Sequence, residues 1–251
     1  LQAVILNTHM RQVLPLAPEP VANTDGTTKQ DCEINAAKRI VKKIRAAHPK
    51  LKMIITADGL YSKQPFVDVL KDARMSFILV AKPTDHKLLV EWVDELDGLG
   101  QGGHLQFSDD KGRRHVYRWV NQVPLNGSRD ADQVNFFEYW LHANQKVTYH
   151  NSWVTDIKVG KNNVVELVQA CRARWKIENE TFNTLKNQGY HIEHNFGHGQ
   201  RYLSNNFFIL NLLAFYLHQI LELCDRGYQY CRSKFSSRKE YWNNLRAVIR
   251  I

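Results

Sequence analysis

The chain has 251 residues, of which 43% are hydrophobic and 24% are charged. This composition predicts a folded protein with a buried core and argues against an intrinsically disordered chain. The net charge of +9 fits a polyanionic partner such as a nucleic acid, although charge alone defines no fold. The four cysteines are scattered without a CxxC pair, which argues against a disulfide framework and against a zinc ribbon.

The first part of the chain predicts strands that alternate with helices. Short runs rich in apolar and β-branched residues suit strands, and apolar residues at helical spacing suit helices between them. Such an alternation indicates an α/β sheet with a parallel component that helices cover. The expected elements are a hairpin at 2–6 and 13–16, a helix at 31–48, a strand at 51–57, a helix at 64–73 and a strand at 75–81.

The middle of the chain changes character after Pro83. A short helix is expected at 86–96, and a glycine-rich stretch follows at 98–103. Strand-like runs separated by polar turns then predict a β-rich insertion, whose last run returns to the main sheet. The expected strands of this part are 104–107, 115–120, 135–140, 146–150 and 153–159.

The last part of the chain is expected to be helical. A long helix from about 162 to 188 ends at Gly189. The apolar segment 203–224 is interrupted by polar residues, so it predicts a core helix and not a membrane span. The tail that follows is basic and aromatic, which suits DNA or a second protomer as well as solvent.

The fold class is therefore α/β, with a mixed sheet flanked by helices. Four segments are expected along the chain. They are a core at 1–83, a helix with the β-rich insertion at 84–152, a return to the core with two long helices at 153–226, and the basic tail at 227–251.

One stretch of the long helix, which reads RARWKIENETFNTLK from residue 172, combines an acid with bases. On a regular α-helix, Glu178 shares a face with Arg174 and Lys186, and Glu180 points to solvent. An inward acid between a guanidinium and an ammonium suits a site for metal ions and phosphates. An ordinary Arg–Glu ion pair on a partly buried helix is the alternative. The packed face also carries Trp175, Phe182 and Leu185.

A second acid, Asp58, directly follows the strand expected at 51–57 and precedes Gly59. Ligands of α/β sheets collect at the carboxyl ends of strands, so an acid there suits a metal ion. A turn aspartate that prepares the next helix is the ordinary alternative. Paired with Glu178, Asp58 could hold Mg²⁺ in a two-metal site for phosphoryl transfer.

These features together resemble the DDE transposases of bacterial insertion sequences. The resemblance rests on TADGLYS after a strand, a β-rich insertion, and RARWKIENETFNTLK on a later helix, and it covers nearly the whole chain. The nearest subgroup carries a Tyr-x2-Arg-x3-Glu-x6-Lys signature. The resemblance implies an RNase H-like fold, Mg²⁺ (or Mn²⁺) as cofactor, and double-stranded transposon-end and target DNA as partners.

The resemblance also implies roles for individual residues. Asp58 would be the second catalytic acid and Glu178 the third, and both would bind metal. Arg174 and Lys186 would hold DNA near the scissile phosphate. The implied setting is the bacterial cytoplasm, near the nucleoid, with a homodimer on paired ends and no membrane. Three further DNA contacts are expected from aromatic and basic positions: Trp119, Trp140 and Arg201.

The chain departs from the family pattern in three places. Cys171 stands at the tyrosine of the signature, and the lysine is one residue late because position 185 is leucine. The first acid of such enzymes lies on the first strand of the sheet, and no acid occurs here before Glu19. We therefore expect that the chain lacks an N-terminal segment with the first catalytic acid, and that cleavage is incomplete without it.

Other functions remain open at this point. A non-catalytic DNA-binding remnant of a transposase would keep the basic surface, and an RNase H-like nuclease would cut without strand transfer. The histidines at 191, 194 and 198 have spacings that could suit zinc, although no cysteine lies near. A loop that faces DNA is the other explanation of these histidines.

Overall fold

The computed structural model describes residues 1–21, 31–195, 197 and 202–249. The chain forms two compact units, which we call the sheet unit (Val21–Arg172) and the hairpin unit (Leu1–Pro20 with Ala173–Ile251). Each is described by itself. The four segments expected from the sequence stay a prediction.

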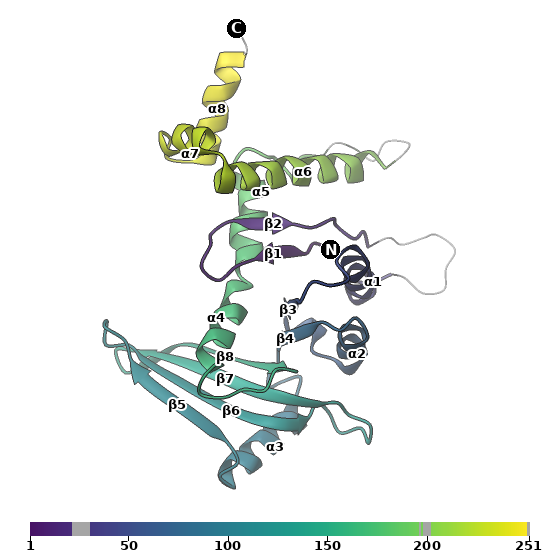
Figure 1. Cartoon of the computed structure of the whole chain (residues 1–251), viewed down its shortest axis with the longest axis vertical. Helices are drawn as coiled ribbons and strands as arrows, with labels where there is room; N and C mark the ends of the chain where they lie inside the picture. Colours follow the sequence, from purple (N-terminus) through teal and green to yellow (C-terminus); the bar gives the residue numbers. More distant parts are fainter. Residues whose placement is uncertain (22–30, 196, 198–201, 250–251) are drawn as a thin grey trace. The chain divides into compact units, whose positions relative to one another are not determined.

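The sheet unit is built on six strands, which Figure 1 shows as one continuous sheet. The first two strands in the sheet are parallel and the remaining neighbours are antiparallel, so the sheet is mixed. In sheet order the strands are β3 (Ile54–Ala57), β4 (Ser76–Val80), β8 (Lys146–Thr155), β7 (Gln133–Ala143), β6 (Arg114–Pro124) and β5 (Gly103–Ser108).

Helices flank this sheet and bury one side each. In α1 (Glu33–Ala47) the buried residues recur at helical spacing, from Ala36 to Val41. The other helices of the unit are α2 (Gln64–Asp72), α3 (Lys87–Gly98) and α4 (Val164–Ala173), whose last residue belongs to the hairpin unit. A mixed sheet flanked by helices confirms the predicted α/β class and is consistent with an RNase H-like fold.

The expected β-rich insertion is continuous with the main sheet. The runs expected at 146–150 and 153–159 form the single strand β8, which pairs with β4 through Thr155 and Ile78. The return to the sheet is therefore confirmed, but the break between the two runs is wrong. Aromatic side chains of β6, β7 and β8, including Trp119, Phe137 and Trp153, form a core that α4 shares.

The hairpin unit begins with the predicted hairpin. Strands β1 (Val4–Leu6) and β2 (Val13–Pro15) pair only with each other among the described strands. Val13 packs with Tyr190 and Phe215 in a small apolar core. The helices of this unit are α5 (Asn183–Asn187), α6 (Leu203–Cys224), α7 (Arg226–Ser233) and α8 (Arg238–Ile249).

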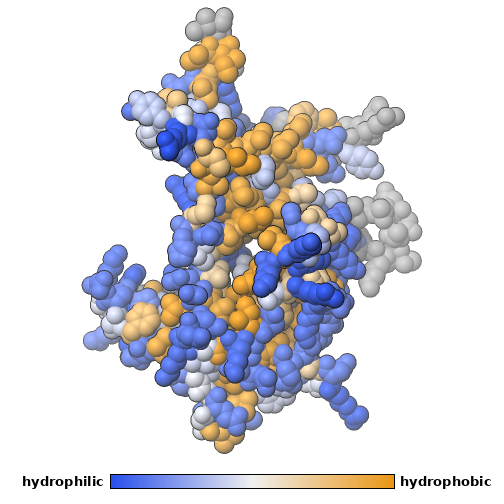
Figure 2. Space-filling model, viewed as in Figure 1, coloured by the Kyte–Doolittle hydropathy of each residue, from blue (hydrophilic) through white to orange (hydrophobic). Residues whose placement is uncertain are grey.

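The helix α6 was expected to be a core helix, and this is correct for one face only. Leu212, Phe215 and Gln219 are buried, whereas Leu210 and Leu217 are more than half exposed. Figure 2 shows hydrophobic residues gathered over this helix. By length and composition α6 also meets the requirements of a membrane-crossing helix. The absence of a membrane partner therefore stays a prediction.

The long helix expected at 162–188 is not a continuous α-helix. α4 ends at Ala173, and a π-helical turn, η2 (Ile177–Phe182), precedes α5. π-turns inside helices are rare, and they displace the side chains that follow from regular α-helical positions. The prediction of one regular helix is wrong, and the error concerns the segment that carries Glu178.

Candidate active site

Asp58 lies at the carboxyl end of β3, as the sequence predicts. It caps the short 3-10 turn η1 (Gly59–Tyr61), because the Leu60 N–H donates to Asp58 Oδ1 at 3.0 Å. The residue is exposed to solvent. Its other carboxylate oxygen lies outside this contact, and the side chain can accept a further ligand.

The turn after Asp58 is anchored to α1. The buried Tyr61 hydroxyl donates to Glu33 Oε1 at 2.6 Å. Burial is the main cause that raises the pKa of Tyr61, and the hydrogen bond to Glu33 raises it further. The phenol therefore stays protonated and remains a donor. The sequence offered no signal for this contact, since the two residues lie 28 positions apart.

Glu178 lies in the π-helical turn and pairs with Arg174, whose Nη1 is 3.2 Å from Glu178 Oε1. The predicted neighbourhood of these two residues is confirmed. The predicted orientation of the face is wrong: 46% of the Glu178 side chain is exposed, against 22% for Glu180. Trp175, expected on the packed side, is 51% exposed. The π-turn accounts for the rotation, since the prediction assumed a regular α-helix.

Two residues that flank Glu178 hold the tip of the β1–β2 hairpin. The Lys176 ammonium donates to the carbonyl oxygens of Asn7 at 2.6 Å and of Met10. Arg11 Nε lies 3.0 Å from Glu180 Oε2. These partners are more than 160 positions apart in the chain, so sequence spacing could not reveal them.

Lys186 does not pair with Glu178 among the described contacts. Its Nζ lies 2.7 Å from Glu193 Oε1, on a part of the surface where both side chains are largely exposed. An exposed pair of this kind contributes little to stability, so DNA phosphates could replace Glu193 at low cost. The role of Lys186 in DNA binding stays a prediction.

The two tryptophans expected at DNA differ in accessibility. Trp119 is 6% exposed and packs against Gly103, so it is a core residue and cannot stack on a base in this conformation. Trp140 is partly exposed and stacks on His150, with ring centroids 4.8 Å apart. The third expected contact, Arg201, lies outside the described residues.

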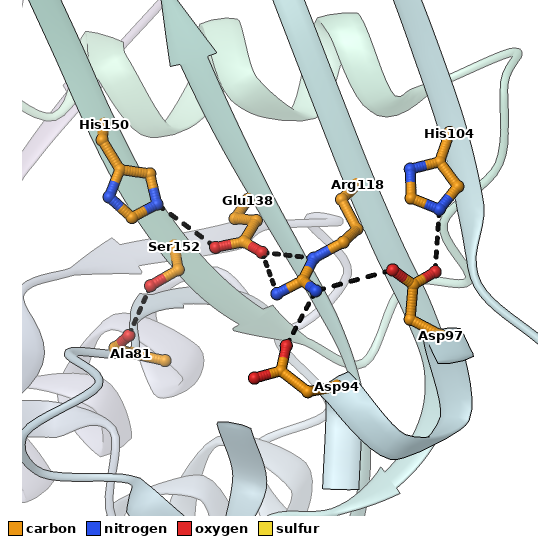
Figure 3. A network of polar contacts seen from close by, with 8 residues as sticks. All are labelled: Ala81, Asp94, Asp97, His104, Arg118, Glu138, His150 and Ser152. Atoms are coloured by element: carbon orange, nitrogen blue, oxygen red, sulfur yellow. Dashed lines mark hydrogen bonds and ion pairs between the residues drawn. The ribbon is translucent and has the colours of Figure 1, made fainter. Parts of the chain in front are cut away.

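A network of polar side chains covers the strands beside Trp140 (Figure 3). The buried Glu138 accepts from Arg118, which also reaches Asp94 at 2.7 Å. Burial works to lower the pKa of Arg118, but Glu138 and Asp94 outweigh it and raise the pKa. The charges are therefore paired, and the network is a structural element of the sheet. Its other members are Asp97, His104, His150 and, through a separate bond to Ala81, Ser152.

In the part of the chain that the structure describes, no group of three or more His, Cys, Asp or Glu side chains could hold a metal ion. The zinc alternative therefore has no support from His191 and His194, and its third member, His198, lies outside the described residues. Asp58 belongs to the sheet unit and Glu178 to the hairpin unit, so the geometry of each is defined within its own unit.

The fold and the residues after β3 define a class of protein that acts on nucleic acid phosphates. A family model described as the transposase DDE domain matches residues 4–217. The chain belongs to this family, which carries out DNA transposition, takes DNA as substrate and typically uses divalent metal ions. No curated protein matches the chain.

Proposed function

We propose that the chain is the core of a transposase that cleaves DNA strands at transposon ends and joins them to target DNA, with Mg²⁺ or Mn²⁺. The observation that carries the proposal is the family match, which spans Asp58 at the carboxyl end of β3 and the motif around Glu178. Carboxylates at these motif positions have the oxygen ligands that Mg²⁺ prefers.

Asp58 and Glu178 fit the metal by their chemistry. Asp58 uses Oδ1 to cap the turn, and Glu178 uses Oε1 to accept from Arg174, so one further oxygen of each can serve as ligand. When bound, divalent ions would polarise the scissile phosphate and activate the attacking hydroxyl. The first acid of the DDE set is not assigned to a residue.

The basic residues of the motif would bind the DNA strand. The Arg174 guanidinium is a planar fork that matches two phosphate oxygens, and Lys186 acts as a compact point charge. Trp140 is the aromatic that remains accessible for stacking on a base. We place the protein in the bacterial cytoplasm, as a homodimer on paired DNA ends.

The metal ligands are tested by titrating the full chain with Mn²⁺ and following free Mn²⁺ by electron paramagnetic resonance. Asp58→Asn and Glu178→Gln should each weaken Mn²⁺ binding by about tenfold or more, because each removes one charged oxygen ligand. Two exposed acids give matched controls, Asp110→Asn and Glu166→Gln, which should bind as the wild type does. Equal binding by all variants would reject the assignment.

The reaction is tested on DNA that carries transposon ends, with Mn²⁺ and a target plasmid. Joining of a 3′ end to the target, lost in Glu178→Gln, supports the transposase. Nicking without joining would favour an RNase H-like nuclease. Binding of DNA by a chain that binds no Mn²⁺ would favour the non-catalytic DNA-binding remnant.

A further inference from the structure

A buried serine–histidine pair joins the two loops that follow the parallel strands β3 and β4. Ser62 Oγ lies 2.8 Å from His86 Nε2, and the two residues are 0% and 7% exposed. The Ser62 hydroxyl also lies 3.0 Å from the Gly59 carbonyl, where it donates. Gly59 directly follows Asp58, so the pair reaches the backbone of the turn that carries the acid.

The same two loops meet a second time at Gly59. A side chain at this position would contact Lys82, because the Lys82 stem lies 3.3 Å from the place of a Cβ atom. Lys82 follows β4 and is exposed at its ammonium end. The carboxyl ends of β3 and β4 are neighbours in a parallel pair, so the turn of Asp58 and the loop of Lys82 form one edge.

His86 is built into its place from several sides. The ring has a hydrogen bond to the backbone of Leu125, and the charged groups that act on it are Lys63 and Asp85. Burial is the main cause that lowers the pKa of His86, and Lys63 lowers it further. The imidazole is therefore neutral at neutral pH. A neutral imidazole has one donor and one acceptor nitrogen, which suits a fixed bridge between two loops.

We propose that His86 is a positioning residue, which acts through Ser62 on the Gly59 carbonyl and so fixes the Asp58 carboxylate beside Lys82. The proposal rests on the proposed function in one respect, that Asp58 binds metal. The positioning itself is a statement about the sheet unit alone, and it can be measured without metal or DNA.

The positioning is tested by hydrogen exchange of the Leu60 amide, which donates to Asp58 and therefore reports on the cap. In the full chain, Ser62→Ala and His86→Leu should speed this exchange by about tenfold or more, because each leaves a buried polar partner unpaired. His86→Gln, whose amide can still reach Ser62, should recover most of the protection.

The matched control removes another buried hydroxyl from the same unit. Thr155→Val deletes the hydroxyl that donates to the Phe77 carbonyl, and it should leave Leu60 exchange unchanged. An unchanged Leu60 amide in Ser62→Ala and His86→Leu would overturn the proposal. Equal acceleration of the Leu60 amide and the amides of β4 would also overturn it, since that result shows general loosening.

A Mn²⁺ titration of the same variants separates this inference from the proposed function. If the wild type binds Mn²⁺ through Asp58, the His86→Leu variant should bind about tenfold more weakly and His86→Gln nearly normally. Binding that is equal in all variants would overturn the positioning role. If the wild type binds no Mn²⁺, the metal assignment fails, and the exchange result alone decides the positioning.

Discussion

Lys176 donates to the main-chain carbonyl of Asn7 at 2.6 Å and so ties the hairpin tip to the π-helical turn that follows it. The same ammonium reaches the carbonyls of Thr8 and Met10. A lysine that saturates its three donors on one loop is a clamp. The clamp lies two residues before Glu178, which makes the hairpin a support of that segment.

Replacing Lys176 with methionine should therefore destabilise the protein. The variant keeps the apolar stem and removes the charge-assisted hydrogen bonds, and we expect a loss of about 1 kcal/mol because these bonds are exposed. The measurement is the free energy of unfolding from urea titration. Lys161→Met is a control at an exposed loop position, and equal losses in the two variants would contradict the clamp.

His218 should make stability depend on pH. Its Nδ1 lies 2.6 Å from the Tyr190 hydroxyl, and burial is the main cause that lowers the pKa of His218 from the ordinary 6.5. As pH falls below 6.5, the unfolded chain binds a proton that the folded chain resists, so stability decreases. Above that pH the ring is neutral in both states and contributes no dependence.

The check is the free energy of unfolding on both sides of that pH. His218→Phe should reduce the decrease on the acidic side, because the variant has no proton to bind at this position. His142→Phe, at a partly exposed histidine on β7, serves as the comparison. An identical pH slope in wild type and His218→Phe would show that other groups dominate.

Trp119 and Trp140 should respond in opposite ways to substitution. Trp119→Phe should lower stability by about 1–3 kcal/mol, since it leaves a gap in the core, and should leave DNA affinity unchanged. Trp140→Ala should weaken binding of DNA with unpaired bases by about 1–3 kcal/mol if the ring stacks on a base. Thermal unfolding and fluorescence anisotropy measure the two effects. Loss of DNA affinity in Trp119→Phe alone would reverse the assignment.

The local elements were within reach of sequence reasoning. Asp58 after a strand, the hairpin and the helix α6 follow from spacing of apolar residues and from turn residues, which act over a few positions. The join of two expected strands into β8 was missed because polar Ser152 suggested a break. Its hydroxyl donates to the Ala81 carbonyl at 2.6 Å, which makes a buried polar residue acceptable within a strand.

The orientation of Glu178 could not be predicted, because the calculation of helix faces assumes 3.6 residues per turn. A π-turn breaks that assumption and has no simple sequence signal. The contacts that hold the candidate site residues were also out of reach. Lys176 with Asn7 and Ser62 with His86 are tertiary pairs, and only folding brings them together.

The strand order of the sheet unit also implies an order of folding. Strands β5 to β8 pair with their neighbours in sequence, so each pairing closes a short loop. The pairing of β8 with β4 is different, because the contact of Thr155 with Phe77 spans 78 positions. Contacts at such separation form slowly. We therefore expect the antiparallel meander to nucleate first, and the edge that carries Asp58 to consolidate last, as the chain closes its longest loop.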